Sequence, residues 1–192
     1  MLASLYLGEA MSHPFLSNTP SQPQGLGDPN AQFNVYIGNR PNCDLIHANR
    51  AVQPLNSSDI GTIGQACGNG WRKVFNVYAK LLFALGRNHF SFNANFPSWQ
   101  AYRDNELLQM GSRTALWFSP PENTAKPGIE LIMGRTYAKS LQLPVSLTWL
   151  NEEFALANER NLIVCPYFDY RQLSNQKILY LVDLLTNLKA TN

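Results

Sequence analysis

The stretch IELIMGRTYAKS, residues 129–140, contains the pattern on which the predicted fold depends. Its first part, Ile129 to Met133, is short, apolar on both faces and ended by Gly134. A run of this kind is typical of a strand in a sheet that is buried between two layers. The residues after the glycine lead into a predicted helical segment, Tyr137 to Leu141.

Three further runs predict strands of the same kind, each followed by glycine or proline within a few residues. Helices are predicted between and after them: a weak one behind Asn56 and longer ones over about 70–85 and 175–189, which carry apolar stripes at helical spacing. Shorter helices are predicted over 97–109 and 151–158. This alternation predicts an α/β fold, a three-layer α/β/α domain with a mostly parallel sheet of about four strands. The three added strands are 33–37, 114–118 and 162–165.

The chain of 192 residues fits a single domain. Residues 12–32 are rich in Pro, Ser, Gln, Asn and Gly, and such a stretch buries too little apolar surface to offset the entropy of ordering it. We therefore assign residues 1–32 to a flexible polar N-terminal arm and residues 33–192 to one α/β domain. Either Met1 or Met11 serves as the natural start.

Composition excludes several classes of protein. The net charge of +2 is too small to indicate a nucleic-acid or membrane partner by itself. The three widely spaced cysteines predict neither disulfides nor a zinc site, and they favour a reducing compartment, here the cytoplasm. No apolar run is long enough to span a membrane. The glycine-rich nucleotide-binding motifs and the zinc-protease and hydrolase motifs are missing, so no cofactor and no metal are predicted. The oligomeric state stays open.

In open parallel sheets, ligands bind outside the carboxyl ends of the strands. The segments after the four predicted strands are rich in Arg, Asn, Asp and Tyr, which suit a polar, planar or anionic ligand. Turn geometry alone also uses Gly, Asn and Pro at these places. His47 has no evident partner that would make it a general base. The predicted ligand-binding residues are Asn39, Arg40, Arg135, Tyr167, Phe168, Tyr170, Arg171, Ser174 and Asn175.

The order of these segments resembles the uracil-DNA glycosylase superfamily. FNVYIGNRPN, residues 33–42, is similar to that family's first strand and GQDPY-type loop, with matches at Gly38 and Pro41. Residues 129–140 resemble its strand, glycine and helix segment. LIVCPYFDYRQLSN, residues 162–175, resembles the last strand and the HPSPLS-type loop, with matches at Leu173 and Ser174. The resemblance implies a glycosylase-like fold with a pocket, and a nucleobase, nucleotide or nucleic acid as partner.

The departures from that family concern its chemistry. The acid that activates water there falls on Arg40, which cannot act as a base. The histidine that stabilises the departing base falls on Asp169, whose charge opposes an anion. No asparagine that could read the base stands near Phe118 and Ser119. The resemblance therefore implies a fold and a pocket rather than uracil excision.

Three hypotheses follow. The first is a binding module for a nucleobase, nucleotide or nucleic acid, in which arginines contact phosphate or base and aromatic side chains stack. The second is a structural or protein-interaction domain. The third is a hydrolase acting on an N-glycosidic bond, with Asp169 or Asp44 as the general base.

Overall fold

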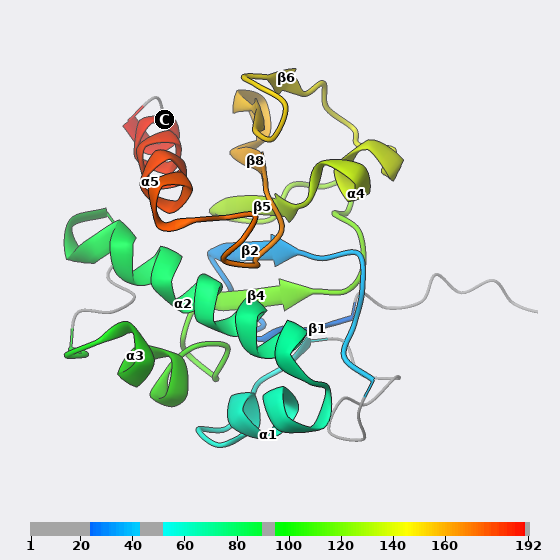
Figure 1. The fold of residues 1–192 in the computed structure, drawn as a ribbon. Coiled ribbons are helices and arrows are strands. Elements are labelled where there is room, and N and C mark those ends of the chain that lie inside the picture. Colours follow the sequence, from blue (N-terminus) through cyan, green and yellow to red (C-terminus); the bar gives the residue numbers. More distant parts are fainter. Residues whose placement is uncertain (1–23, 43–51, 90–94, 191–192) are drawn as a thin grey trace, which may run out of the picture.

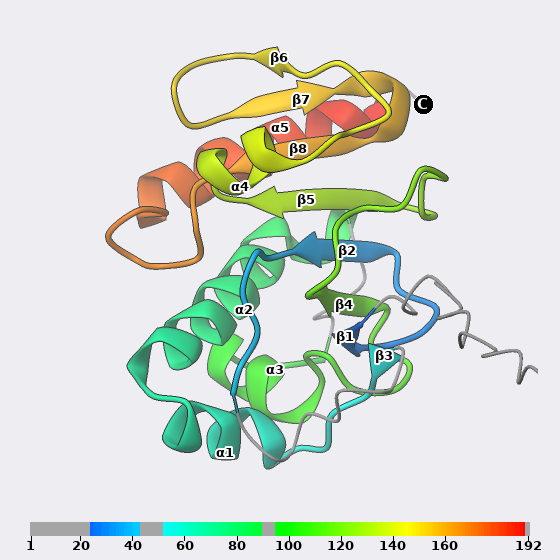
Figure 2. The same ribbon diagram turned by 90° about the vertical axis from the view of Figure 1, so that its right-hand side faces the viewer.

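The computed structural model describes residues 24–42, 52–89 and 95–190. Over these residues the chain forms a single mixed sheet of eight strands in the order β3-β1-β4-β2-β5-β8-β7-β6. Figure 1 shows the helices on the two faces of this sheet, and Figure 2 shows the strands stacked from β6 to β3.

The centre of the sheet consists of the strands that the sequence predicts. Neighbouring central strands pair in parallel, in the order β4-β2-β5-β8. Their ends differ from the prediction by one residue at most, because Gly or Pro stops each run. The bounds are Phe33–Tyr36 for β2, Thr114–Trp117 for β4, Ile129–Met133 for β5 and Leu162–Cys165 for β8.

The prediction of a glycosylase-like sheet of about four strands is wrong, because short strands extend the sheet on both sides. The pairs β1–β4, β7–β8 and β6–β7 are antiparallel, whereas β3 is parallel to β1. These strands have only two or three residues, so they leave little pattern in the sequence. Their bounds are Gly25–Gly27 for β1, Val52–Gln53 for β3, Thr148–Trp149 for β6 and Ala155–Ala157 for β7.

Two segments therefore differ from their predicted role. Residues 24–32, assigned to the arm, include β1, whose residues are all buried. Residues 151–158, predicted to be helical, form a turn and β7 instead. The side-chain amide oxygen of Asn151 accepts hydrogen bonds from the backbone N–H groups of Glu153 and Phe154, which fixes this turn.

The helices agree with the prediction more closely. The long helix α2 is interrupted at Gly86, where φ is 68°, at the position predicted for its stop. Of the predicted helix over 97–109, only the residues of α3, Trp99–Asn105, are helical. None of the helices in the described segments has the length and apolar character needed to cross a membrane. The bounds are Asp59–Ala66 for α1, Asn69–His89 for α2, Trp99–Asn105 for α3, Arg135–Ser140 for α4 and Asn175–Ala190 for α5.

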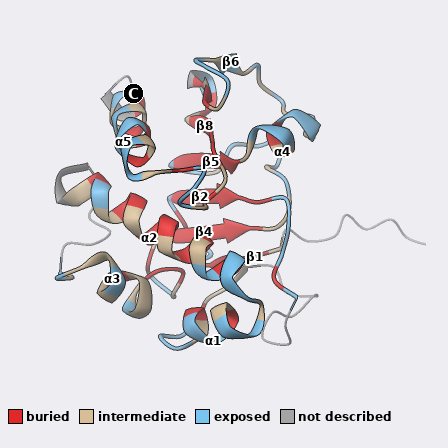
Figure 3. Cartoon of the chain, in the orientation of Figure 1, coloured by how far each residue is buried: buried red, intermediate tan, exposed pale blue. Residues whose placement is uncertain are grey.

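Alternating strand residues divide the core between the two faces of the sheet, and the four central strands are buried throughout (Figure 3). Leu131 and Met133 pack with α2 and α5, whereas Ile132 packs with Ala138 of α4. The chain after α4 continues this second layer with partly buried side chains from Leu141 to Trp149. The second face is thus covered by one short helix and irregular chain, and not by a full helical layer.

A buried polar network lies on the α4 face. Glu130 and Arg160 form an ion pair with side chains that are 0 % and 3 % exposed. The Tyr36 hydroxyl donates to Glu130 at 2.8 Å. Arg160 also donates to the carbonyl oxygens of Glu122 and Asn123 in the connection between β4 and β5. The network therefore ties β2, β5, the chain before β8 and that connection together.

We predict that Arg160→Ala lowers the free energy of unfolding by about 3–5 kcal/mol, because it leaves the Glu130 carboxylate buried without its cation. Tyr36→Phe removes one hydrogen bond to a charged group and should cost about 1.5–3 kcal/mol. Urea denaturation measures both. Lys177→Ala is the control, since it breaks a more exposed ion pair with Glu153 and should cost at most about 1 kcal/mol. Equal costs for Arg160→Ala and Lys177→Ala would contradict the structural role of the network.

Candidate functional site

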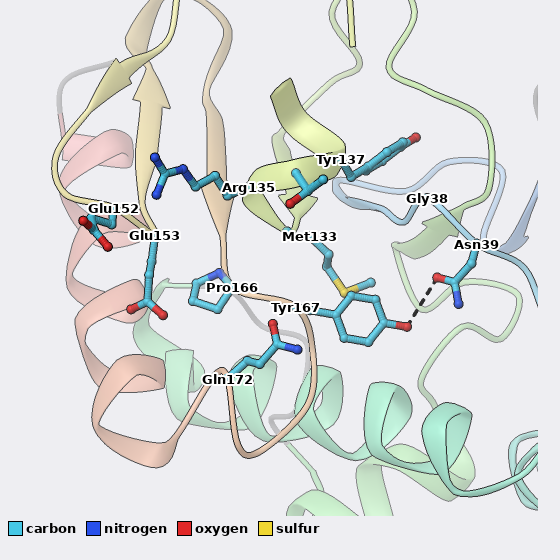
Figure 4. Close-up of a pocket in the computed structure, with 12 residues that line it drawn as sticks. Gly38, Asn39, Met133, Arg135, Tyr137, Glu152, Glu153, Pro166, Tyr167 and Gln172 are labelled. Carbon is cyan, nitrogen blue, oxygen red and sulfur yellow. Dashed lines mark hydrogen bonds between the residues drawn. The ribbon is translucent and has the colours of Figure 1, made fainter. Parts of the chain in front are cut away.

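A cavity of about 480 Å³ lies beyond the carboxyl ends of β2, β5 and β8. Its walls come from the three segments that follow these strands and from the turn between β6 and β7 (Figure 4). We call it the edge pocket. Its lining residues are Gly38, Asn39, Met133, Gly134, Arg135, Thr136, Tyr137, Glu152, Glu153, Pro166, Tyr167 and Gln172.

The topology of the sheet explains why a pocket opens here. The strands β2 and β5 are neighbours, but the chain leaves them in different directions. After β2 it leads through β3 to α1 and α2, and α2 packs on one face, whereas after β5 it enters α4 on the other face. Chain segments that diverge from adjacent parallel strands leave a crevice at the strand ends, which is the usual ligand site of such sheets.

Two glycines shape the walls. A Cβ on Gly38 would lie 2.9 Å from the Tyr137 ring, so glycine allows the chain after β2 to pass close to α4. Gly134 has φ 95°, which suits glycine and turns the chain sharply from β5 into α4. Buried side chains, Met133 and Pro166, give the pocket an apolar side.

The polar groups of the pocket include both donors and acceptors. The Tyr167 hydroxyl donates to the Asn39 amide oxygen at 3.3 Å, which links the segments after β8 and β2 (Figure 4). Burial raises the pKa of the Tyr167 and Tyr137 phenols above their usual value, so both remain protonated donors at neutral pH. The side-chain amides of Asn39 and Gln172 each offer both an N–H₂ donor and a carbonyl acceptor.

Charges of both signs face the pocket. Figure 4 shows Arg135 reaching from α4 toward the turn that carries Glu152 and Glu153. The guanidinium carbon of Arg135 lies 5.6 Å from the centre of the Trp149 ring, a stacking contact that orients this side chain. Glu153 accepts an ion-pair contact of 2.6 Å from Lys177. Arg135 and Glu152 are therefore the charged side chains most available to a ligand.

Of the predicted site residues, the structure brings Asn39, Arg135 and Tyr167 together in the edge pocket. The others do not line it. Arg40 donates to the Gln24 side chain at 2.9 Å. Ser174 accepts a hydrogen bond from the Lys177 N–H in the first turn of α5, and Asn175 begins that helix. Phe168 is completely buried against Tyr78, so its ring is not available for stacking on a ligand.

Asp169 has a structural role. It pairs with Lys73 of α2 at 2.8 Å, and its other oxygen accepts the Arg171 N–H at 2.9 Å. These contacts, the one to Lys73 above all, lower the pKa of Asp169, so it is a weak base held away from the pocket lining. Asp44, the other predicted base, and His47 lie outside the described residues.

Tyr170 and Arg171 lie on the protein surface next to this ion pair. The Lys73 ammonium lies 4.9 Å from the centre of the Tyr170 ring, and the Arg171 guanidinium carbon lies 5.9 Å from it. Tyr170 is 55 % exposed. These side chains form a cationic and aromatic surface beside the edge pocket rather than part of its wall.

Glu152 and Glu153 lie in the segment 151–158 that is predicted to be a helix, so their contribution to the pocket was not expected from the sequence. The signal for their true position was Asn151, a turn-forming residue between the aromatic residues Trp149 and Phe154. Within the described segments, no cluster of three or more His, Cys, Asp or Glu side chains is placed to hold a metal. Cys165 is fully buried, and burial raises the pKa of its thiol, so it is a poor nucleophile.

The fold and pocket together define an α/β protein with an open mixed sheet. Its polar cavity lies where the chain leaves the neighbouring strands β2 and β5 in different directions. A family model described as a family of unknown function, DUF6942, matches residues 24–186. The chain belongs to this family. Comparison with curated proteins and with solved structures gives no match. The sequence resemblance to uracil-DNA glycosylases stays an untested prediction.

We predict that Lys73→Met raises the pKa of Asp169 toward its ordinary value, because the main contact that lowers it is lost. A carboxylate with a lowered pKa stabilises the fold fully above its ordinary pKa. This contribution disappears as the pH falls from the ordinary pKa through the lowered one. Asp169→Asn should therefore cost stability at pH 7 and nothing at strongly acid pH. Carboxyl NMR titration and urea denaturation measure the two effects. Lys139→Met is the control, and an unchanged Asp169 pKa in Lys73→Met would refute the assignment.

Proposed function

We propose that the protein is a binding module whose edge pocket holds a nucleobase or nucleoside. The observation that carries this proposal is the convergence of donors and acceptors from three strand ends around one cavity of about 480 Å³. Sites for small organic molecules typically have volumes of about 300–1,000 Å³.

The polar groups of the pocket match the edge of a nucleobase. A base presents donors and acceptors side by side, and the Asn39 and Gln172 amides offer the same two groups in return. Arg135 adds a donor for a ring carbonyl, and the Glu152 carboxylate accepts from an amino group. The partly buried ring of Tyr167 provides a face on which a base can stack.

The charges in the pocket favour a nucleoside over a nucleotide. The pocket lining has one arginine and two glutamates, although Lys177 pairs with one of these carboxylates. A triphosphate tail would meet the Glu152 carboxylate with little cationic compensation. The ligand most compatible with this lining is neutral or carries a single positive charge.

Turnover by the predicted hydrolase route has less support. Asp169 is held in its ion pair with Lys73, away from the lining. The carboxylates that do line the pocket, Glu152 and Glu153, stand on a turn of the sheet edge, and one is paired. A binding role requires none of these groups to accept a proton.

The test is isothermal titration with the common nucleobases and nucleosides and with the matching 5′-triphosphates. We expect a nucleobase or nucleoside to bind more tightly than its triphosphate, with little dependence on salt because no phosphate is contacted. Arg135→Ala should weaken binding about tenfold or more, the effect of losing a hydrogen bond from a charged group.

Lys139→Ala provides the matched control. Lys139 and Arg135 both lie over the Trp149 ring, at 5.4 and 5.6 Å, but only Arg135 lines the pocket. Lys139→Ala should therefore bind the nucleoside as the parent protein does. The proposal fails when no nucleobase or nucleoside binds, or when the two variants have the same affinity.

The alternative of a protein-interaction domain has one observation in its favour. Leu179 and Tyr180 on α5 are 60 % and 39 % exposed, and Leu150 in the nearby turn is 42 % exposed. Apolar side chains gathered on a surface are common at interfaces between proteins. Sedimentation of the parent protein and of Leu179→Glu over a range of concentrations tests this alternative, which requires association that the variant lacks.

A further inference from the structure

A second cavity, of about 460 Å³, lies among α1, α2 and α3 and shares no lining residue with the edge pocket. One wall is α1, with Gly61 and Gly64, and another is the first part of α2, with Asn69 and Arg72. Arg103 reaches it from α3. The helices that enclose it pack closely on α2, so this is a defined feature of the helical layer. We call it the helix pocket.

The charge of the helix pocket differs from that of the edge pocket. Its lining includes two arginines, three amide side chains and no carboxylate. Arg72 is exposed at the mouth, and Gly64 of α1 lies against its side chain, with an added Cβ 3.5 Å from the Cβ of Arg72. Apart from Ile60 and the glycines, a ligand that enters this cavity therefore meets cationic and neutral polar side chains.

Arg103 is held in a fixed orientation. Two of its N–H groups bind both oxygens of Asp104, at 2.7 and 3.0 Å, and a third donates to the Asn76 amide oxygen. A guanidinium has five N–H donors, so two remain for a ligand. The Asp104 carboxylate offsets part of the Arg103 charge. The net attraction for an anion thus depends on Arg72, while Arg103 supplies oriented donors.

The glycines of α1 leave the cavity wall open. Gly61 lies within the helix and is exposed, and a Cβ there would meet no atom within 4 Å. Packing therefore does not require glycine at this position, although glycine is a poor helix former. A side chain at residue 61 would stand at the wall of the same cavity that Arg72 lines.

We infer that the helix pocket binds the phosphate group of a small phosphorylated molecule. Arg72 and Arg103 would donate to the phosphate oxygens, since guanidinium groups match phosphate geometry and form charge-assisted hydrogen bonds. The cavity is much larger than a bare phosphate, and Gln65, Asn69 and Asn76 offer amides to a hydroxyl-bearing remainder. Inorganic phosphate and a sugar phosphate share this chemistry and are distinguished by affinity.

The experiment is an NMR titration of the ¹⁵N-labelled protein with inorganic phosphate, ribose 5-phosphate and ribose at constant ionic strength. Glycine amides report on each pocket in the same spectrum: Gly61, Gly64 and Gly68 for the helix pocket, Gly38 and Gly134 for the edge pocket. We expect ribose 5-phosphate to shift the amide signals of the helix-pocket glycines with at least tenfold higher affinity than inorganic phosphate does. Ribose should shift the glycine signals of neither pocket.

Three variants separate binding from folding. Arg72→Gln should weaken the binding of ribose 5-phosphate at least tenfold. Lys139→Gln changes an exposed charge on the opposite face of the sheet and should leave this affinity unchanged. Gly61→Glu places a carboxylate at the wall and replaces an exposed glycine inside α1 by a better helix former, so it should fold at least as stably and yet lose phosphate binding.

The inference is overturned when neither phosphate compound shifts the glycines of the helix pocket. It is equally overturned when Arg72→Gln, or Gly61→Glu in its folded state, binds as the parent does. Equal affinity for phosphate and ribose 5-phosphate would restrict the site to the inorganic anion and refute the sugar-phosphate assignment. Because the edge pocket has its own glycine reporters, the result does not depend on whether a nucleoside binds there.

Discussion

The common direction of β4, β2, β5 and β8 is the constraint from which the edge pocket follows. Parallel pairing brings the chain out of each strand at the same edge of the sheet, and the chain after β2 and after β5 then diverges toward opposite faces. The buried ion pair of Glu130 and Arg160 supports this arrangement, because it fixes β5 against the chain that enters β8. A buried ion pair is favourable only when its other hydrogen bonds are made, and here Tyr36 and two backbone carbonyl groups complete them.

The sequence predicts the centre of this fold better than its margins. The central strands are apolar on both faces and end at Gly or Pro, and α2 and α5 have continuous apolar stripes, so burial alone specifies them. By contrast, β1 reads Gly-Leu-Gly and β7 reads Ala-Leu-Ala, with no β-branched or alternating pattern. Such strands form because a neighbouring strand presents unpaired backbone groups, which is a property of the assembled sheet and not of the local sequence. The extra strands, and hence the mixed sheet, could not be predicted for this reason.

The location of the candidate site could be predicted from the sequence, but only some of its residues could. Asn39, Arg135 and Tyr167 follow strand ends directly, where the chain has no room to turn away. Beyond Tyr167 the local turn decides the direction of each side chain, so Phe168 enters the core while Tyr170 remains exposed. Asp169 depends on Lys73, a partner 96 residues earlier that no local pattern reveals. Glu152 and Glu153 reach the pocket through the hairpin of β6 and β7, which the sequence did not indicate.

The two cavities give the molecule two polar surfaces of different charge, one mixed and one cationic. The central claim concerns the first, at the ends of β2, β5 and β8, and crystallographic screening with small heterocyclic and aliphatic fragments tests it most directly. Heterocycles that carry adjacent donors and acceptors should appear in electron density against Asn39, Arg135 and Tyr167, with aliphatic fragments missing from that place. Heterocycles that bind only elsewhere, in crystals where this cavity is open to solvent, would contradict the account.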